Sequence, residues 1–144
     1  MLFRHLFLAV LFLCAAPVLA LAQSAEDAST NLNLELNAIQ DVGEGCRLTF
    51  LVRNETGLTV DKAVFETVIF DTSGGAVKLS LFDFRDLPVD RPRVRQFDLP
   101  QMACNTVNQV LINGANSCVV KGAESSVCDD ALILNSRLAI ELIG

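Results

Sequence analysis

The sequence predicts an all-β domain, an immunoglobulin-like β-sandwich of about seven strands with two disulfides. Apolar and polar side chains alternate over 31–39 and again over 46–54, as in strands that bury one face. The segment 63–100 reads as strand, Gly-Gly turn, strand, proline-bounded loop and strand. Turn residues separate short strands along the whole chain, which is the spacing typical of a sandwich.

The first two expected strands are 31–39 and 46–54. Three leucines and three polar residues occupy opposite faces of the first strand. The turn 41–45 separates the two, and Asn54-Glu-Thr-Gly57 ends the second. The expected inward residues of the second strand are Cys46, Leu48, Phe50 and Val52.

The next three strands form an expected β-meander. Apolar residues on both faces of 64–70 favour a central strand, and Asp71-Thr-Ser-Gly-Gly75 suits a hairpin turn. In 77–84 the apolar pattern changes phase at Phe82, and in 94–99 it changes again before Phe97. A β-bulge near 95–96 would restore the second pattern.

The final third predicts two further elements. The segment 105–113 is compatible with a strand or a short helix, and its β-branched residues favour a strand that ends at Asn113-Gly114. The segment 131–144 is expected to close the fold as one strand. Its apolar residues fall on one face: Leu132, Leu134, Leu138, Ile140 and Leu142.

The N-terminal residues predict export. A basic start (Arg4), an apolar run over 6–13 and a small-x-small motif predict a signal peptide, 1–22, cleaved between Ala22 and Gln23. A transmembrane anchor is the alternative, but 6–22 is short for a span and contains Pro17. A flexible leader, 23–30, and one domain, 31–144, would follow.

Two missing sequence features indicate the export route. Leu13 stands before Cys14 where a lipoprotein signal needs a small residue, and there is no twin arginine. General (Sec-type) secretion to the periplasm or beyond is therefore expected.

Charge and composition exclude several functions. Cleavage would leave 144 − 22 = 122 residues with 10 basic and 17 acidic side chains, a net charge of −7. This balance argues against nucleic acid and anionic membrane surfaces as partners. The chain's one histidine, His5, lies in the expected signal peptide. A mature domain without histidine cannot build a Ser-His-Asp or Cys-His site, so no enzyme activity and no cofactor or metal are expected.

Four cysteines remain in the expected mature chain, and an exported domain favours their oxidation to two disulfides. Three pairings are open. We favour Cys46–Cys104, tying an early strand to a late one, with Cys118–Cys128 closing a short loop between two strand-like segments. A four-thiolate metal site is disfavoured because close CxxC pairs are absent.

Charged residues supply the candidate sites. Arg91, Arg93 and Arg95 alternate, so they could present one face to a carboxylate, a phosphate or an acidic partner. The plainer interpretation is a solvated face balanced by neighbouring acids. Two acidic sets also have a plainer interpretation. A calcium set (Glu124, Asp129, Asp130) is expected to be solvated, and nothing in the sequence places a glycosidase-like pair (Asp83, Asp86) across a cleft.

Two resemblances emerge from these segments. The pattern Arg53-Asn54-x-Thr56-Gly57-Leu58, Phe65, Ile69-Phe70-Asp71, Gly75, Leu87-Pro88 and Phe97 resembles FxLYD-type and late-embryogenesis-type sandwich domains. Cys46-Arg-Leu-Thr-Phe50, Arg93-Val-Arg-Gln-Phe-Asp-Leu-Pro100, Cys104 and Val110-Leu-Ile-Asn113 resemble small exported bacterial proteins labelled "Tat pathway signal sequence domain protein". The resemblance implies export and a sandwich, and no site residues.

The functional expectation is a non-enzymatic binding or structural module of the bacterial cell envelope, with an envelope protein as partner. The alternative is a periplasmic inhibitor or carrier of an anionic ligand at Arg91–Arg95. A hydrolase built from carboxylates alone ranks last.

Overall fold

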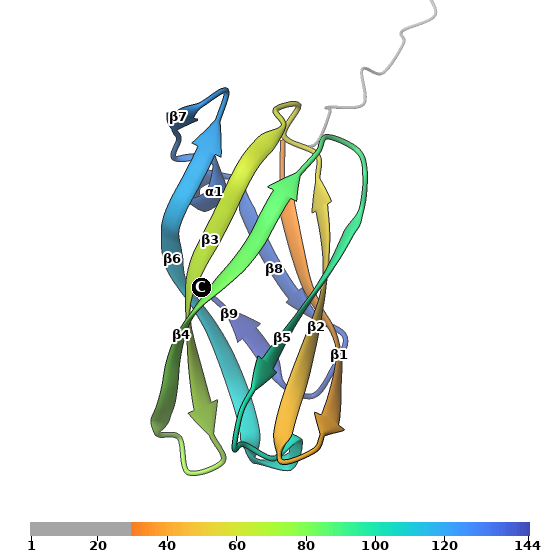
Figure 1. Ribbon diagram of the computed structural model, residues 1–144, viewed down its shortest axis with the longest axis vertical. Helices are drawn as coiled ribbons and strands as arrows, with labels where there is room; N and C mark the ends of the chain where they lie inside the picture. The colour runs from red at the N-terminus through yellow and green to blue at the C-terminus, as the bar shows by residue number, and fades with distance from the viewer. Residues whose placement is uncertain (1–29) are drawn as a thin grey trace, which may run out of the picture.

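The computed structural model describes residues 30–144, which form two β-sheets packed face to face (Figure 1). The expected signal peptide 1–22, its cleavage site at Ala22 and Gln23, and the leader up to residue 29 lie outside the described residues. The immunoglobulin-like sandwich expected from the alternating sequence is confirmed.

The first sheet has the strand order β5-β2-β1-β8. Strand β1 pairs antiparallel with β2 and parallel with β8, and β2 pairs antiparallel with β5. The strand bounds are β1 (Leu32–Val42), β2 (Gly45–Asn54), β5 (Arg93–Leu99) and β8 (Leu132–Ser136).

The second sheet has the order β4-β3-β6-β7, and β9 also pairs with β6. The strand bounds are β3 (Val60–Asp71), β4 (Ala76–Leu87), β6 (Val107–Val120), β7 (Ala123–Glu124) and β9 (Glu141–Ile143). A 3-10 helix, η1 (Cys104–Thr106), and a short α-helix, α1 (Val127–Asp130), complete the described elements. Seven of the strands have five or more residues, as the sequence predicts.

The core lies between the sheets because each strand turns its alternate apolar residues inward. The inward side chains of β1 and β2 are buried, as their alternation predicts. Phe50 makes edge-on ring contacts with Phe82, Phe84 and Phe97, at centroid distances of 6.1, 5.5 and 5.9 Å. Each fully buried side chain of this kind contributes about 1.5–3 kcal/mol.

Both expected disulfides are confirmed. Cys46 of β2 bonds Cys104 of η1, and Cys118 of β6 bonds Cys128 of α1. Each bond therefore joins a strand to a helix: the first does not tie two strands together, and the second does not join two strand-like segments. Two disulfides indicate an oxidising, extracytoplasmic compartment. The described part of the chain contains no helix with the length and apolar character needed to cross a bilayer.

The expected meander is wrong at its third strand. The hairpin of β3 and β4 forms, and its turn places Gly74 at a φ of 83°, where glycine is favoured. However, β5 pairs with β2 in the other sheet. The loop 88–92 carries the chain across, and two non-glycine residues have positive φ here: Arg85 near the end of β4 and Asp90 within the loop. Figure 1 shows this loop at the top of the view.

The crossing is anchored by Asn54, a buried side chain at the end of β2. Its amide nitrogen donates to the carbonyl oxygens of Leu58 (2.8 Å) and Leu87 (2.7 Å), and its side-chain oxygen accepts from Thr56. Its backbone also forms an isolated parallel bridge with Val89. One side chain therefore ties the end of β2 to the loop before β3 and to the end of β4.

The expected bulge near 95–96 is absent, because β2 and β5 keep one register from Cys46↔Leu99 to Val52↔Arg93. Val94 points to solvent and Phe97 packs against the core, so opposite faces explain the spacing. The phase change expected in β4 has the same explanation. Phe82 is buried while Leu79 and Leu81 are exposed, with no register shift between Leu79 and Phe82.

The last third of the chain differs from the sequence prediction in two respects. Strand β6 does not end at Asn113-Gly114 but continues to Val120, because Gly114, at a φ of 143°, accommodates a register shift. The expected single closing strand is two: β8 in the first sheet and β9 in the second. The break between them lets Leu134 and Leu142 reach the core from different sheets.

Candidate binding surface

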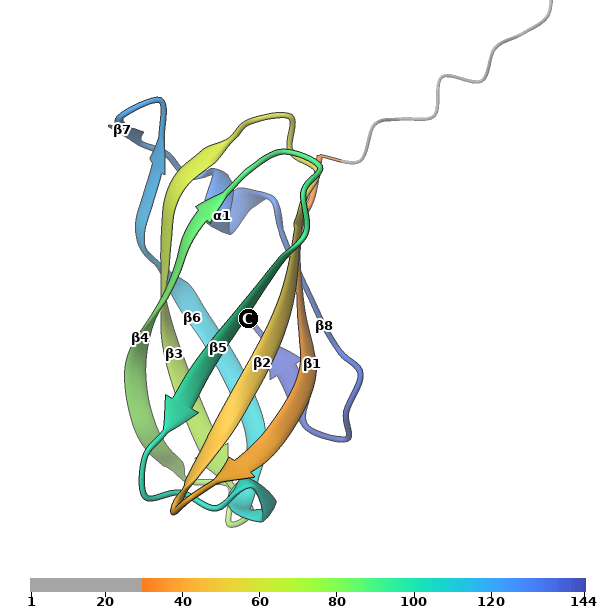
Figure 2. The same ribbon diagram turned by 45° about the vertical axis from the view of Figure 1, so that its right-hand side comes forward.

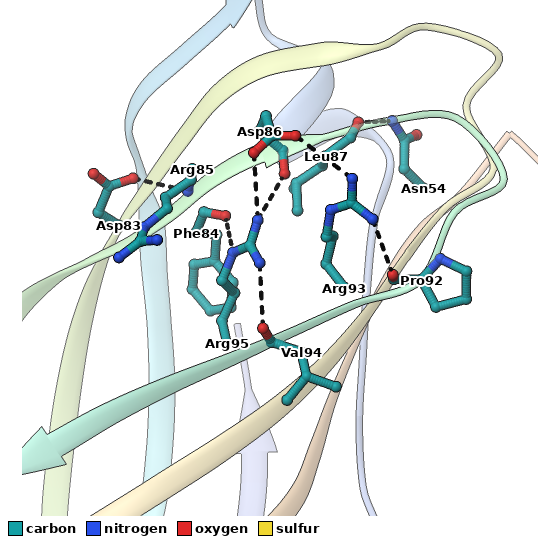
Figure 3. Close-up of polar contacts among 10 residues, drawn as sticks. All are labelled: Asn54, Asp83, Phe84, Arg85, Asp86, Leu87, Pro92, Arg93, Val94 and Arg95. Atoms are coloured by element: carbon teal, nitrogen blue, oxygen red, sulfur yellow. Dashed lines mark hydrogen bonds and ion pairs between the residues drawn. The ribbon is translucent and has the colours of Figure 1, made fainter.

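The three predicted arginines do not form one ladder. Arg91 precedes β5, whereas Arg93 and Arg95 lie on the strand with their side chains directed toward β4 (Figure 3). The Arg95 guanidinium donates to the carbonyl oxygens of Phe84 (2.6 Å) and Asp86 (3.0 Å). The Asp86 carboxylate lies 3.5 Å from Arg95 and 3.7 Å from Arg93.

This arginine cluster joins the two sheets. Arg95 reaches from the edge of one sheet to backbone carbonyls of the edge strand of the other, and its side chain is 17% exposed. Arg93 is 26% exposed. The two guanidinium groups share one carboxylate, so the cluster keeps a net positive charge.

Four of the five predicted acidic residues have local partners, and the fifth, Glu124, is exposed on β7. Asp83 accepts from the backbone N–H of Arg85 (2.8 Å), and Asp86 faces the arginines. Asp129 accepts from the backbone N–H of Ala115 (2.8 Å), and Asp130 accepts from the hydroxyl of Ser126. Within residues 30–144, no three His, Cys, Asp or Glu side chains are placed to hold a metal ion.

The edge strands β4 and β5 run along the same side of the sandwich (Figure 2). Between them, the rings of Phe82 and Phe97 stack at 4.2 Å with an interplanar angle of 6°. A hollow of about 520 Å³ lies over this stack and is also lined by Ser80, Leu81 and Gln96. We call this hollow the seam groove.

An ion pair between Arg47 and Asp98 lines part of the seam groove. The guanidinium of Arg47 donates to both carboxylate oxygens of Asp98, at 2.7 and 2.8 Å. This hydrogen bonding lowers the pKa of Asp98, because it stabilises the carboxylate. A second hollow of about 570 Å³ shares Leu81, Gln96 and Phe97 and extends to Asp83 and Val94. The seam therefore continues along several residues of both strands.

The outer side of β4 carries a stripe of exposed apolar residues. Val77, Leu79 and Leu81 are 50%, 63% and 55% exposed, and no charged residue lies between Lys78 and Asp83. We call these three residues the β4 stripe. Strand β4 pairs with β3 on one side, and no other strand of residues 30–144 pairs with it. An unprotected edge of this kind is unusual, because edge strands commonly carry charges or proline.

The stripe continues across the sheet through the strand register. Leu79 lies opposite Val68 of β3, Val68 lies opposite Leu111 of β6, and Leu111 lies opposite Ile143 of β9. Residues opposite each other in a sheet share a face, so these four residues form one row. The β4 stripe and this row make up the outer apolar face: Val68, Val77, Leu79, Leu81, Leu111 and Ile143.

The sequence pattern does not predict this face. It places Val77, Leu79 and Leu81 on one face of their strand and predicts a change of phase at Phe82, not a second apolar face. One feature of the sequence could have indicated this face. Apolar residues occupy both faces of 77–84, as they do in 64–70, and this pattern also fits a strand with one buried and one exposed apolar face.

The arrangement defines a class of protein: a disulfide-containing immunoglobulin-like sandwich with an exposed apolar edge. No protein-family model matches the chain, and no curated protein matches it. Among solved structures it is similar to the one titled "Structural characterization of IrmA from Escherichia coli". The TM-score is 0.55 and the identity 10%, over 72% of this chain and 90% of that one. At this identity the likeness concerns the fold alone.

Proposed function

We propose that this protein is a non-enzymatic binding module of the bacterial cell envelope, which engages a protein partner through the outer apolar face. The chain would be exported by a Sec-type signal peptide and act in the periplasm or outside the cell. The disulfides and the predicted signal peptide support this location.

The β4 stripe is the observation that carries the proposal. Three neighbouring apolar side chains, each at least half exposed, lie on a strand whose outer edge has no partner among residues 30–144. Contiguous exposed apolar surface marks interaction sites, because leaving it in water is unfavourable. A surface of this kind suits a partner protein better than a charged ligand.

The test is a cross-linking pull-down of the tagged protein from intact cells, analysed without reductant. The expected result is a stoichiometric envelope partner that is captured by the natural chain and lost with Leu79→Asp. The matched control is Ile133→Asp, since Ile133 is 45% exposed on β8, in the other sheet. Equal capture by Leu79→Asp and the natural chain would contradict the proposal.

A second candidate function is binding of an anionic ligand at Arg91, Arg93 and Arg95. The observation that favours it is the net positive charge of two guanidinium groups sharing Asp86. A ligand carboxylate or phosphate would have to compete with Asp86 for Arg93 and Arg95, which makes this the weaker candidate.

This candidate is tested by titrating inorganic phosphate and a dicarboxylate into the natural protein and into a variant with all three arginines replaced by glutamine. The expected result for this function is binding to the natural protein that is lost in the variant. Unchanged binding in the variant would exclude the three arginines as an anion-binding site.

A further inference from the structure

We infer that the partner contributes an extended segment, which adds as a further strand along the free edge of β4. This inference rests on the proposed function and names its mode of binding. The segment would carry apolar residues at every second position and a basic residue at the end next to Asp83. Backbone pairing and side-chain packing would both contribute to its affinity.

The backbone of β4 permits this pairing. Its residues 79–82 contain no charge and no proline, and the next edge strand, β5, belongs to the other sheet. Arg95 covers the carbonyl oxygens of Phe84 and Asp86 only. The stretch from Leu79 to Phe82 therefore lies beyond the reach of these arginine contacts.

The two faces of an added strand would meet different surroundings. On one face, every second side chain would lie beside Val77, Leu79 and Leu81, because directly opposed residues share a face. The side chains of the other face would lie over the seam groove, whose 520 Å³ is bordered by Ser80, Gln96 and the Arg47–Asp98 pair. Alternating apolar and small polar residues match these surroundings.

Size argues for a segment and against a second folded copy. The β4 stripe spans four residue steps, about 13 Å, and is one strand wide. A stable interface between folded proteins buries about 800 Å² on each partner. Beyond the stripe, the row across the sheet is less exposed: Ile143 is 38% exposed, and Val68 and Leu111 are half-buried. The side chains of one added strand would lie directly beside the stripe and match its length.

The charge beside β4 decides which end of the added segment carries its basic residue. The residue after the stripe on the same face is Asp83. An added strand therefore meets one carboxylate at that end, and a lysine or arginine there is complementary to it.

The experiment uses two fluorescein-labelled peptides, KTVTVTV and its reverse VTVTVTK, with blocked ends, titrated against the natural chain and followed by fluorescence anisotropy. One of the two directions should bind. Leu79→Asp and Leu81→Asp should weaken binding at least tenfold, and Ile133→Asp should leave it unchanged. Replacing the peptide lysine by glutamate should weaken binding to the natural chain, and Asp83→Asn should abolish that preference.

Backbone pairing is tested with N-methylated peptides, which keep the side chains but lose N–H donors. Alternate N–H groups of a strand point to opposite sides, so methylating one alternate set should block binding and methylating the other should not. Equal binding by both methylated sets would overturn strand addition, as would equal loss with Ile133→Asp.

The inference and the proposed function fail separately. If an envelope partner is captured through Leu79 but neither peptide binds, strand addition is wrong and the binding role stands. If neither a partner nor a peptide requires Leu79, both are wrong.

Discussion

Asn54 shows how one polar residue can hold a corner of a β-sandwich. Its buried amide nitrogen donates to two backbone carbonyl oxygens, of which the Leu58 oxygen also accepts from the Thr56 hydroxyl. We expect Asn54→Ala to lower the free energy of unfolding by about 2–4 kcal/mol, measured by urea denaturation. Asn113→Ala is the control, because Asn113 is exposed and hydrogen-bonded to Glu66. Equal losses in the two variants would contradict this role.

Thr67 is also a buried polar residue but, unlike Asn54, its side chain has no hydrogen-bond partner among the described residues. Its hydroxyl is buried in β3. Because an unpaired buried hydroxyl destabilises the folded state, we expect Thr67→Val to raise the free energy of unfolding by about 1 kcal/mol. Thr49→Val is the control: the Thr49 hydroxyl accepts from Gln96, so this change should bring no gain. A loss of stability in Thr67→Val would indicate an unseen partner.

At the scale of the element, one face of β4 stabilises the fold and the other face carries the proposed binding residues. Phe82 is buried and stacked on Phe97, whereas Leu79 is 63% exposed on the other face. We expect Phe82→Ala to lower the free energy of unfolding by about 3–4 kcal/mol and Leu79→Ser to change it by less than about 0.5 kcal/mol. Thermal or chemical denaturation of both variants checks this. A large loss with Leu79→Ser would mean that the β4 stripe supports the fold.

Strands β1 and β2 could be predicted from sequence because each buries one face, which leaves a period of two. The assignment of strands to sheets could not, because the pairing of β5 depends on a loop crossing held by Asn54 and not on any pattern within 93–99. The alternating arginines could be identified from the sequence by their charge. Their contacts with Asp86 could not be predicted, because these contacts depend on the same loop crossing. The β4 stripe was missed because exposed and buried apolar residues look alike in a sequence.

At the scale of the whole molecule, the disulfides tie the ends of the sheets to nearby helices. Chain-entropy estimates assign about 4 kcal/mol to Cys46–Cys104 and about 3 kcal/mol to Cys118–Cys128, because the first closes the longer loop. We expect the paired alanine variants to lose free energy of unfolding in that order, measured by denaturation under non-reducing conditions. A larger loss from removing Cys118–Cys128 would show that native contacts, not loop length, decide the order.

The parallel pairing of β1 with β8 has a kinetic consequence. Leu32 lies opposite Leu132, a separation of 132 − 32 = 100 residues. A chain whose first strand must wait for one of its last has a high contact order, and such chains fold in milliseconds to seconds. Until β8 is available, one edge of β1 has no neighbour. Slow completion of this kind suits a chain that, on the proposed export route, crosses a membrane before it folds.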